Sequence, residues 1–142
     1  MIDEYIIDYD DYIGVGAGSV SFVKGNFYVN TFSLEEYDSL IANEKLPIVR
    51  WRKLSEREYL RYYMLTKLFG MTLDPQKFYQ RFNDDIHKKL RLELLFFKLF
   101  GLTHHNRQIN VTRKGMYTAS VMMKEFFAAL NGLREYFIEN KL

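Results

Sequence analysis

Helix start and stop signals recur along residues 55–142, and they constrain the fold more than any other feature of the sequence. The expected starts are a capping box at Ser55 and Glu58, an Asp74-Pro75 pair, and Asn83 or Asp84; the expected stops are Gly70, the region of Phe82, and Gly101. A capping side chain satisfies N–H groups that the first turn leaves unpaired, and glycine accepts the left-handed conformation that often ends a helix. These signals predict a helix, a short helix and a third helix in succession.

A small hairpin and a long helix are expected after Gly101. Leu102-Thr103 and residues 109–111 read as two short strands around a polar turn at residues 104–108. Thr112 can cap a last helix from about Arg113 to Asn140, roughly 40 Å long at 1.5 Å per residue. The order helix, short helix, helix, hairpin is that of a winged helix, to which the long closing helix is an addition.

The first third of the chain is rich in Tyr, Val, Ile and Gly and has no helical period. Residues 12–16 read as a short strand that ends in a glycine-rich turn, and residues 20–23 and 27–29 flank Lys24-Gly25-Asn26 as a β-hairpin. Residues 33–54 hold a short helix, which Ser33 and Glu36 start as a reciprocal capping box. Its expected buried stripe is Tyr37, Leu40 and Ile41, and an extended segment runs over residues 48–51 after Pro47.

The sequence therefore predicts an α+β fold, with a small β-hairpin region followed by a mainly helical, winged-helix-like domain. We expect three regions: residues 1–32, a remnant of a larger strand region; residues 33–54, a connecting helix and loop; and residues 55–142, the helical C-terminal domain.

Composition excludes several classes of chemistry. The sequence has no cysteine, so it has no disulfide, no thiolate zinc site, no cysteine nucleophile and no iron–sulfur cluster held wholly by this chain. Its 20 basic and 18 acidic side chains leave a net charge of +2, which gives no reason to expect a polyanionic partner. No apolar run is long enough to span a membrane. The acidic start (Asp3, Glu4, Asp8, Asp10, Asp11) is unlike a signal peptide, so we expect a cytoplasmic protein.

The glycine segment Gly14-Val-Gly16-Ala-Gly18-Ser19 is the first candidate site. A dinucleotide fingerprint needs its third glycine one residue later and a helix start directly after it, whereas the residues after Ser19 are β-rich. Two interpretations stay open. The glycines allow a tight turn and close backbone approach, or bare backbone packs against a ligand that something else holds.

Three other groups favour structural interpretations. His104 and His105, with His87, could bind a metal, but adjacent histidines on a strand point to opposite faces, so we expect a solvated hairpin tip. Asp8 and Asp10 would share a strand face but lack a positioned partner. The aromatic stripes have helical spacing and indicate core before a macrocycle groove: Tyr59, Tyr62, Tyr63; Phe96, Phe97, Phe100; Phe126, Phe127, Phe137.

Nucleic-acid binding is not favoured. The helix that a winged helix would insert into a groove carries His87, Lys88, Lys89 and Arg91, diluted by the acids Asp84, Asp85 and Glu93. No nucleophile, acid–base pair or metal set emerges from the chain. We therefore expect no catalytic and no metal-ligating residue, and no complete enzyme.

The order of segments resembles the region after the barrel in oxygen-independent coproporphyrinogen III oxidases and the related haem chaperones, which are radical S-adenosylmethionine (SAM) proteins. The matching segments are Asp11-Tyr-Ile-Gly14-Val-Gly16-Ala-Gly18-Ser-Val-Ser21-Phe, Gly25-Asn-Phe-Tyr28-Val-Asn30, Glu36-Tyr37, Leu46-Pro47, Leu54-Ser55-Glu56, Leu102 after Phe100-Gly101, and Ile109-Asn-Val111-Thr112-Arg-Lys-Gly115. The resemblance covers essentially the whole chain.

The resemblance implies that the chain is the C-terminal region of a longer protein. In that family a barrel holds a [4Fe–4S] cluster and SAM, the glycine segment lies near the SAM side, and the helical domain covers the mouth of the tetrapyrrole site. It therefore implies a cofactor-proximal role for Gly16, Ala17, Ser19 and Val20. Its implied partners are a tetrapyrrole substrate together with the missing barrel, and a homodimer could form through apolar surface exposed on residues 12–32. The alternatives are the same domain of a haem-binding chaperone, or a winged-helix nucleic-acid module.

Overall fold

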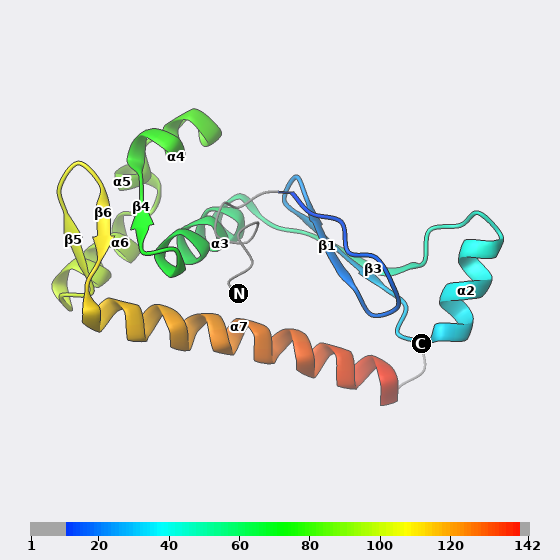
Figure 1. Cartoon of the computed structure of the whole chain (residues 1–142). Helices are drawn as coiled ribbons and strands as arrows, with labels where there is room; N and C mark the ends of the chain where they lie inside the picture. The colour runs from blue at the N-terminus through cyan, green and yellow to red at the C-terminus, as the bar shows by residue number, and fades with distance from the viewer. Residues whose placement is uncertain (1–10, 140–142) are drawn as a thin grey trace. The chain divides into compact units, whose positions relative to one another are not determined.

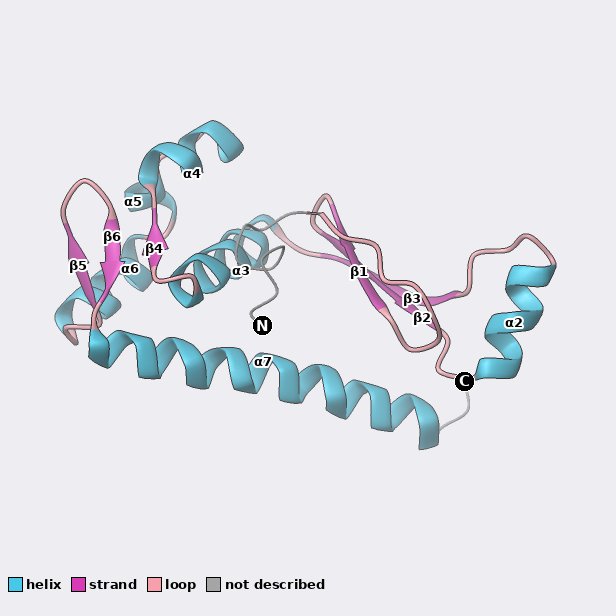
Figure 2. Ribbon diagram, in the orientation of Figure 1, coloured by secondary structure: helices cyan, strands magenta, loops and turns pink. Residues whose placement is uncertain are grey.

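The computed structural model describes residues 11–139 of the chain, and Figures 1 and 2 show their helices and strands. The fold is α+β, with a long C-terminal helix as expected. The described residues divide into two compact units. We call residues 56–125 the C-terminal unit, and residues 11–55 together with residues 126–139 the N-terminal unit. Each unit has its own three-stranded antiparallel sheet. Within residues 11–139 no helix combines the length and the apolar character that crossing a membrane requires.

The sheet of the N-terminal unit has the order β1-β2-β3 and consists of β1 (Val20–Val23), β2 (Asn26–Asn30) and β3 (Ile48–Lys53). The predicted hairpin is confirmed, because β1 pairs with β2 from Val20↔Val29 to Val23↔Asn26. Lys24 and Gly25 join them with φ values of 48° and 78°, as a two-residue turn with both central residues left-handed requires. The predicted extended segment is also confirmed, since β3 completes the sheet beside β2.

Helix α2 (Leu34–Ala42) begins where the sequence predicts, but its start differs from the expected reciprocal box. The N–H of Glu36 donates to Ser33 Oγ at 3.3 Å. The Glu36 carboxylate, however, accepts the Thr31 hydroxyl, and Thr31 Oγ1 accepts the N–H of Ser33. Thr31, which is buried, therefore replaces the direct contact between Glu36 and the backbone of Ser33.

The expected buried stripe of α2 is wrong for this chain. None of the nine residues of α2, all of which the structure describes, is buried, and Ile41 is about half exposed. The spacing of Tyr37, Leu40 and Ile41 is helical, but a helical period specifies only that one face is apolar, not what covers it.

The C-terminal unit contains the predicted order of helix, short helix, helix and hairpin, with one extra strand. Its elements are α3 (Glu56–Phe69), β4 (Thr72–Leu73), α4 (Pro75–Phe82), α5 (Ile86–Lys89), α6 (Arg91–Leu99), β5 (Thr103–His105), β6 (Ile109–Val111) and the first part of α7 (Arg113–Glu139). The sheet order is β4-β6-β5. β4 has two residues, too few for an alternating pattern in the sequence to reveal it.

The third predicted helix is two helices. The chain breaks at Leu90 (φ −117°), whose side chain is fully buried, so α5 and α6 follow one another. Asp85, and not Asn83 or Asp84, caps α5, since its carboxylate accepts the N–H of His87 at 2.7 Å. Asn83 instead ends α4 in the left-handed conformation. The predicted Asp74 cap and Pro75 start of α4 are confirmed.

The core of the C-terminal unit is aliphatic and aromatic. Its fully buried side chains include Leu68, Leu73, Phe78, Ile86, Leu90 and Ile109. The Phe78 ring lies 5.6 Å from that of Tyr63 and 4.7 Å from that of Phe82. The aromatic stripes are thus core only in part: Tyr62, Tyr63 and Phe97 are buried, but Phe96 and Phe100 are about half exposed. The side chains of Phe127 and Phe137 lie outside the described residues.

The Thr112-Arg-Lys-Gly115 segment makes the junction between the hairpin and α7. Thr112 Oγ1 donates to the carbonyl oxygen of Gly101 at 2.8 Å and accepts the N–H of Gly115 at 3.0 Å, which confirms the predicted cap. A Cβ on Gly115 would lie 1.9 Å from the carbonyl oxygen of Leu102. The close approach of two backbones therefore explains both residues of this motif.

Candidate functional site

The glycine segment is a loop held by hydrogen bonds, and the predicted turn lies at residues 16–18. The short strand predicted over residues 12–16 is wrong, because only an isolated bridge between Tyr12 and Phe22 is present there. Beyond it, the N–H of Gly14 donates to Ser21 Oγ at 3.1 Å, that of Gly16 to the Tyr37 hydroxyl at 3.1 Å, and that of Gly18 to the Thr31 carbonyl at 2.7 Å. These bonds tie the loop to β1, to α2 and to the end of β2.

The polar groups of Gly16 and Ser19 bond to each other and to residues of β2 and α2. The Gly16 carbonyl accepts the Ser19 hydroxyl at 2.8 Å and the Asn30 amide at 3.2 Å, and the same amide donates to Ser19 Oγ at 2.9 Å. Val20 begins β1 opposite Val29. The structure thus joins Gly16 and Ser19 directly, with Ala17 between them in the same loop. A ligand at this loop would meet backbone and apolar atoms more than available hydrogen-bonding groups.

The glycines of the loop differ in why they are needed. A Cβ on Gly14 would lie 2.5 Å from the Val20 carbonyl oxygen, and one on Gly18 (φ 70°) 2.6 Å from the Phe32 ring. Close packing accounts for both. Gly16 has a φ of 107°, yet no described atom lies within 4 Å of where its Cβ would be. Next to it Val15 is 85% exposed, so this side of the loop presents an apolar, open surface.

The histidines lie differently from the expected hairpin tip. His104 and His105 are in β5, and the turn is confined to residues 106–108. The rings of His105 and His87 are 6.3 Å apart, while the His104 side chain is exposed. Across residues 11–139, no three His, Asp or Glu side chains gather as a metal site would need. Asp8 and Asp10 lie outside the described residues, and Asp11 accepts the N–H of Lys24 at 3.0 Å.

The C-terminal unit should lose stability when the pH is lowered below about 6.5, at a pH where its carboxylates are still ionised. Burial, and then the nearby Lys98 and His87, lower the pKa of His105 below its usual 6.5. The folded chain therefore binds this proton less readily than the unfolded chain, so stability is complete above pH 6.5 and is lost as the pH falls below it. The thermal unfolding midpoint should drop as the pH is lowered from 7.5 to 5, and His105→Gln should make this drop smaller. The exposed neighbour provides the control, His104→Gln; equal slopes for both variants would contradict the assignment.

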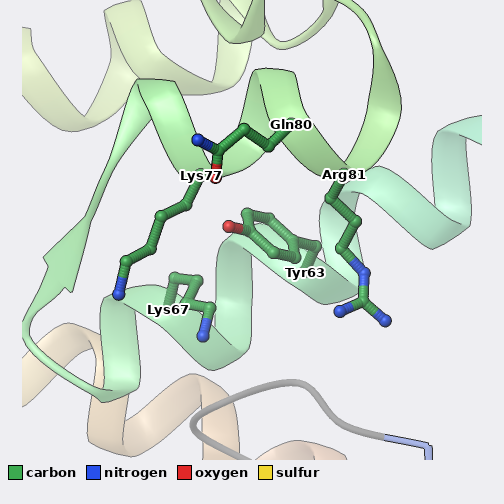
Figure 3. A pocket seen from close by; sticks show the side chains of 5 residues that line it. All are labelled: Tyr63, Lys67, Lys77, Gln80 and Arg81. Carbon is green, nitrogen blue, oxygen red and sulfur yellow. The ribbon is translucent and has the colours of Figure 1, made fainter.

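A pocket of about 290 Å³ lies between α3 and α4 and was not predicted from the sequence. It is lined by Tyr63, Lys67, Lys77, Gln80 and Arg81, which Figure 3 shows as sticks. The available signal was spacing: Tyr63 and Lys67 are four residues apart on one helix, and Lys77 and Arg81 are four apart on the next, so each pair shares a helix face.

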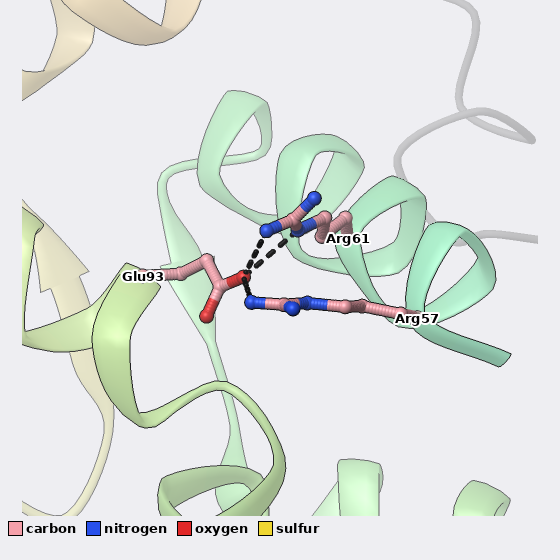
Figure 4. Close-up of polar contacts among 3 residues, drawn as sticks. All are labelled: Arg57, Arg61 and Glu93. Atoms are coloured by element: carbon pink, nitrogen blue, oxygen red, sulfur yellow. Dashed lines mark hydrogen bonds and ion pairs between the residues drawn. The ribbon is translucent and has the colours of Figure 1, made fainter.

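A second charged cluster joins α3 to α6. Arg61 donates through Nε to Glu93 Oε1 at 2.8 Å, and Arg57 reaches the same oxygen at 3.3 Å, as Figure 4 shows. The Glu93 side chain is only 14% exposed. Its burial raises the pKa of the carboxyl, but its own N–H and the two guanidinium groups outweigh this and hold the pKa below its usual value. The cluster links α3 to α6, because Arg57 and Arg61 both bond to Glu93. We therefore assign it a structural role.

Replacing Glu93 should weaken this link between α3 and α6. We expect Glu93→Gln to lower the free energy of unfolding by about 1 kcal/mol, because the neutral amide loses the charge-assisted bonds to two arginines that are themselves half exposed. Urea denaturation followed by circular dichroism measures this. Glu125→Gln, an exposed glutamate on α7, is the matched control and should have little effect. Equal midpoints for the two variants would show that the cluster contributes nothing.

No family model and no curated protein sequence matches the chain. Among solved structures, the chain is similar to the coproporphyrinogen III oxidase HemN from Escherichia coli, described as a radical SAM enzyme, with a TM-score of 0.61 and 19% sequence identity. The match covers 78% of this chain and 27% of that enzyme, so the chain corresponds to about a quarter of its length. Over 78% of its length, the α+β fold of this chain is therefore similar to part of that enzyme.

Proposed function

We propose that this chain is the non-catalytic, substrate-covering C-terminal domain of an oxygen-independent coproporphyrinogen III oxidase-like radical SAM protein in the cytoplasm. The observation that carries the proposal is the structural match to 27% of the Escherichia coli enzyme over 78% of this chain. Fold likeness alone does not establish activity, so the role rests on what the residues can and cannot do.

The chain does not fit the cofactors that such a protein needs. A [4Fe–4S] cluster requires thiolate ligands, and the sequence contains no cysteine. The described residues also offer no group of three other ligands. The cluster and SAM would therefore be held by a barrel outside this chain. The glycine loop would meet the cofactor side through Gly16, Ala17, Ser19 and Val20, by contact rather than by hydrogen bonds, since Gly16 and Ser19 are already bonded to each other.

Covering a radical reaction is a task for apolar surface. Radical intermediates must be kept from water, and the protein supplies enclosure while the cofactor supplies the chemistry. The N-terminal unit exposes an unusual set of large apolar side chains: Ile13, Val15, Leu34, Ile41, Leu46, Ile48 and Trp51. Such surface favours a partner, and we assign it to the barrel and its tetrapyrrole. In the absence of the barrel the same side chains would promote a homodimer.

The winged-helix order of the C-terminal unit does not favour a nucleic-acid partner. The helix that would enter a groove includes α6, whose exposed side chains are the four large apolar ones Leu92, Leu95, Phe96 and Leu99 and the two cations Arg91 and Lys98, so apolar side chains outnumber cations on it. A groove-binding helix needs cations and polar groups there. A duplex mobility-shift assay at low salt should therefore show no complex.

A haem-carrying role is the second candidate, and the proximity of His87 and His105 is the observation that favours it. A neutral imidazole is an axial ligand of haem, and the lowered pKa of His105 keeps that ring neutral near pH 7. Haem titration separates the two candidates. A Soret shift that His105→Ala abolishes, without coproporphyrinogen turnover by the protein assembled with its barrel, would favour the carrier.

The decisive experiment is anaerobic reconstitution with iron and sulfide. We expect the 142-residue chain alone to gain no cluster absorbance and to cleave no SAM. Produced together with a radical SAM barrel that carries a Cys-x-x-x-Cys-x-x-Cys segment, it should raise coproporphyrinogen oxidation above that of the barrel alone. A stable cluster on this chain alone, or full turnover without it, would refute the proposal.

A further inference from the structure

The pocket between α3 and α4 has a composition that none of the functions above uses. Three of its five lining side chains are cations (Lys67, Lys77, Arg81), and the other two are hydrogen-bonding groups, Tyr63 and Gln80. None of these five described residues is acidic. Figure 3 shows that Tyr63 and Lys67 come from α3 and the other three from α4, so the packing of two helices brings the charges together.

Tyr63 forms the floor of the pocket, and its ring is held in place by the core. The residue is 2% exposed, and its ring packs edge-on against Phe78 and Phe82 in the core. In Figure 3 its hydroxyl points toward the side where Lys77 and Gln80 lie, and Arg81 lies on the other side of the ring. Burial, opposed by Arg81 and reinforced by Asp74, raises the pKa of this hydroxyl, so it stays protonated and able to donate.

Asp74, a carboxylate that influences Tyr63 in the pocket, has hydrogen-bond partners of its own. Asp74 caps α4 by accepting the N–H of Gln76 at 2.8 Å, and it also accepts the Gln108 amide at 3.1 Å. The Gln76 N–H, with smaller help from Gln108 and Lys77, holds the pKa of Asp74 below its usual value. The carboxylate thus has a structural role at the helix start, on the rim of α4, and does not line the pocket.

We propose that this pocket binds a compact polyanion, either a phosphate monoester or a polycarboxylate. Both present several negative oxygens on a small group. A guanidinium can donate two parallel bonds to such oxygens, and an ammonium interacts with them as a point charge. Arg81 and the two lysines supply these groups, while Tyr63 and Gln80 add neutral donors. At about 290 Å³ the pocket is at the small end of ligand sites, which suits a single charged group.

The site is independent of the proposed covering role, because it lies wholly within α3 and α4 and uses neither the glycine loop nor the apolar side chains of the N-terminal unit. A nucleic-acid backbone is disfavoured, since it needs a basic stripe along a surface rather than one small concave cluster.

Binding is tested by titrating the 142-residue protein at pH 7.5 with inorganic phosphate and, separately, with citrate, each against sodium chloride at matched ionic strength. We expect a saturable rise in thermal midpoint and amide shifts in ¹⁵N NMR spectra that centre on residues 77–81. Phosphate alone would identify the phosphate ester, and citrate alone the polycarboxylate. Lys77→Gln with Arg81→Gln should weaken binding about tenfold or more, because two exposed charged donors are removed.

The matched control removes the same charge from exposed positions outside the pocket, Arg107→Gln with Lys124→Gln, and should bind like the parent protein. The NMR shifts in the parent protein give an answer even if the pocket variant is less stable. Equal stabilisation by sodium chloride, equal binding by the pocket variant and the control, or shifts centred away from α3 and α4 would overturn the proposal.

Discussion

Replacing Gly115 with alanine should unfold the C-terminal unit or come close to it. The added Cβ would lie 1.9 Å from the carbonyl oxygen and 2.8 Å from the carbonyl carbon of Leu102, and neither is the end of a flexible side chain. The two backbones are fixed there because Thr112 bonds to both Gly101 and Leu102. Relief would require α7 to move away from the hairpin. We expect a loss above about 4 kcal/mol, the range of severe backbone or core disruption.

The sign of this effect makes the test sharp. Glycine to alanine in an exposed helix interior normally stabilises it by about 1 kcal/mol. Gly132 is also in α7, and no described atom lies within 4 Å of where its Cβ would be. Gly132→Ala should therefore raise the unfolding midpoint measured by circular dichroism, and Gly115→Ala should lower it. Two alanine variants with the same sign would show that the approach of α7 to Leu102 is not fixed in solution.

Local signals predicted the C-terminal unit well where they were chemically specific. The Asp74-Pro75 start and the Thr112 cap require particular side chains at particular places, and both were found. The split at Leu90 was not predictable, because Leu90 fits the apolar period of one continuous helix and only its burial reveals the break. The two helix starts predicted from the sequence, Asn83 and Asp84, were wrong, because Asp85 beside them has the same capping chemistry and only the structure shows that it caps α5.

The N-terminal unit shows a different limit. The hairpin was predictable because Lys24-Gly25 is a local turn signal. A glycine-rich turn was also predictable, but the hydrogen bonds that hold Gly16 were not, since they come from Asn30 and Tyr37, which are distant in sequence. The apolar residues of α2 have helical spacing, but among the described residues nothing buries them. Burial is a property of what lies opposite a face, which a periodic pattern does not contain.

The basic pocket was missed for a related reason. A net charge of +2 argued against anionic ligands, but net charge averages over the surface and says nothing about local concentration. Lys67 and Arg81 become neighbours only when α4 packs on α3. That packing is set by the aromatic core beneath them, so the pocket and the core should respond together to a substitution in the core.

Phe78→Ala tests this connection. Phe78 is fully buried between the rings of Tyr63 and Phe82, and removing a buried phenylalanine ring typically costs about 3–5 kcal/mol, from lost burial and from the cavity left behind. We expect a loss of about 4 kcal/mol in urea denaturation. Phe96→Ala removes the same ring from a side chain that is 51% exposed and should cost less than about 1 kcal/mol.

Because Phe78 supports the Tyr63 ring, Phe78→Ala should also weaken phosphate or citrate binding, whereas Phe96→Ala should not. Similar stabilities for the two variants would mean that α4 is not held on α3 by this cluster, and the geometry of the pocket would then lack its physical basis.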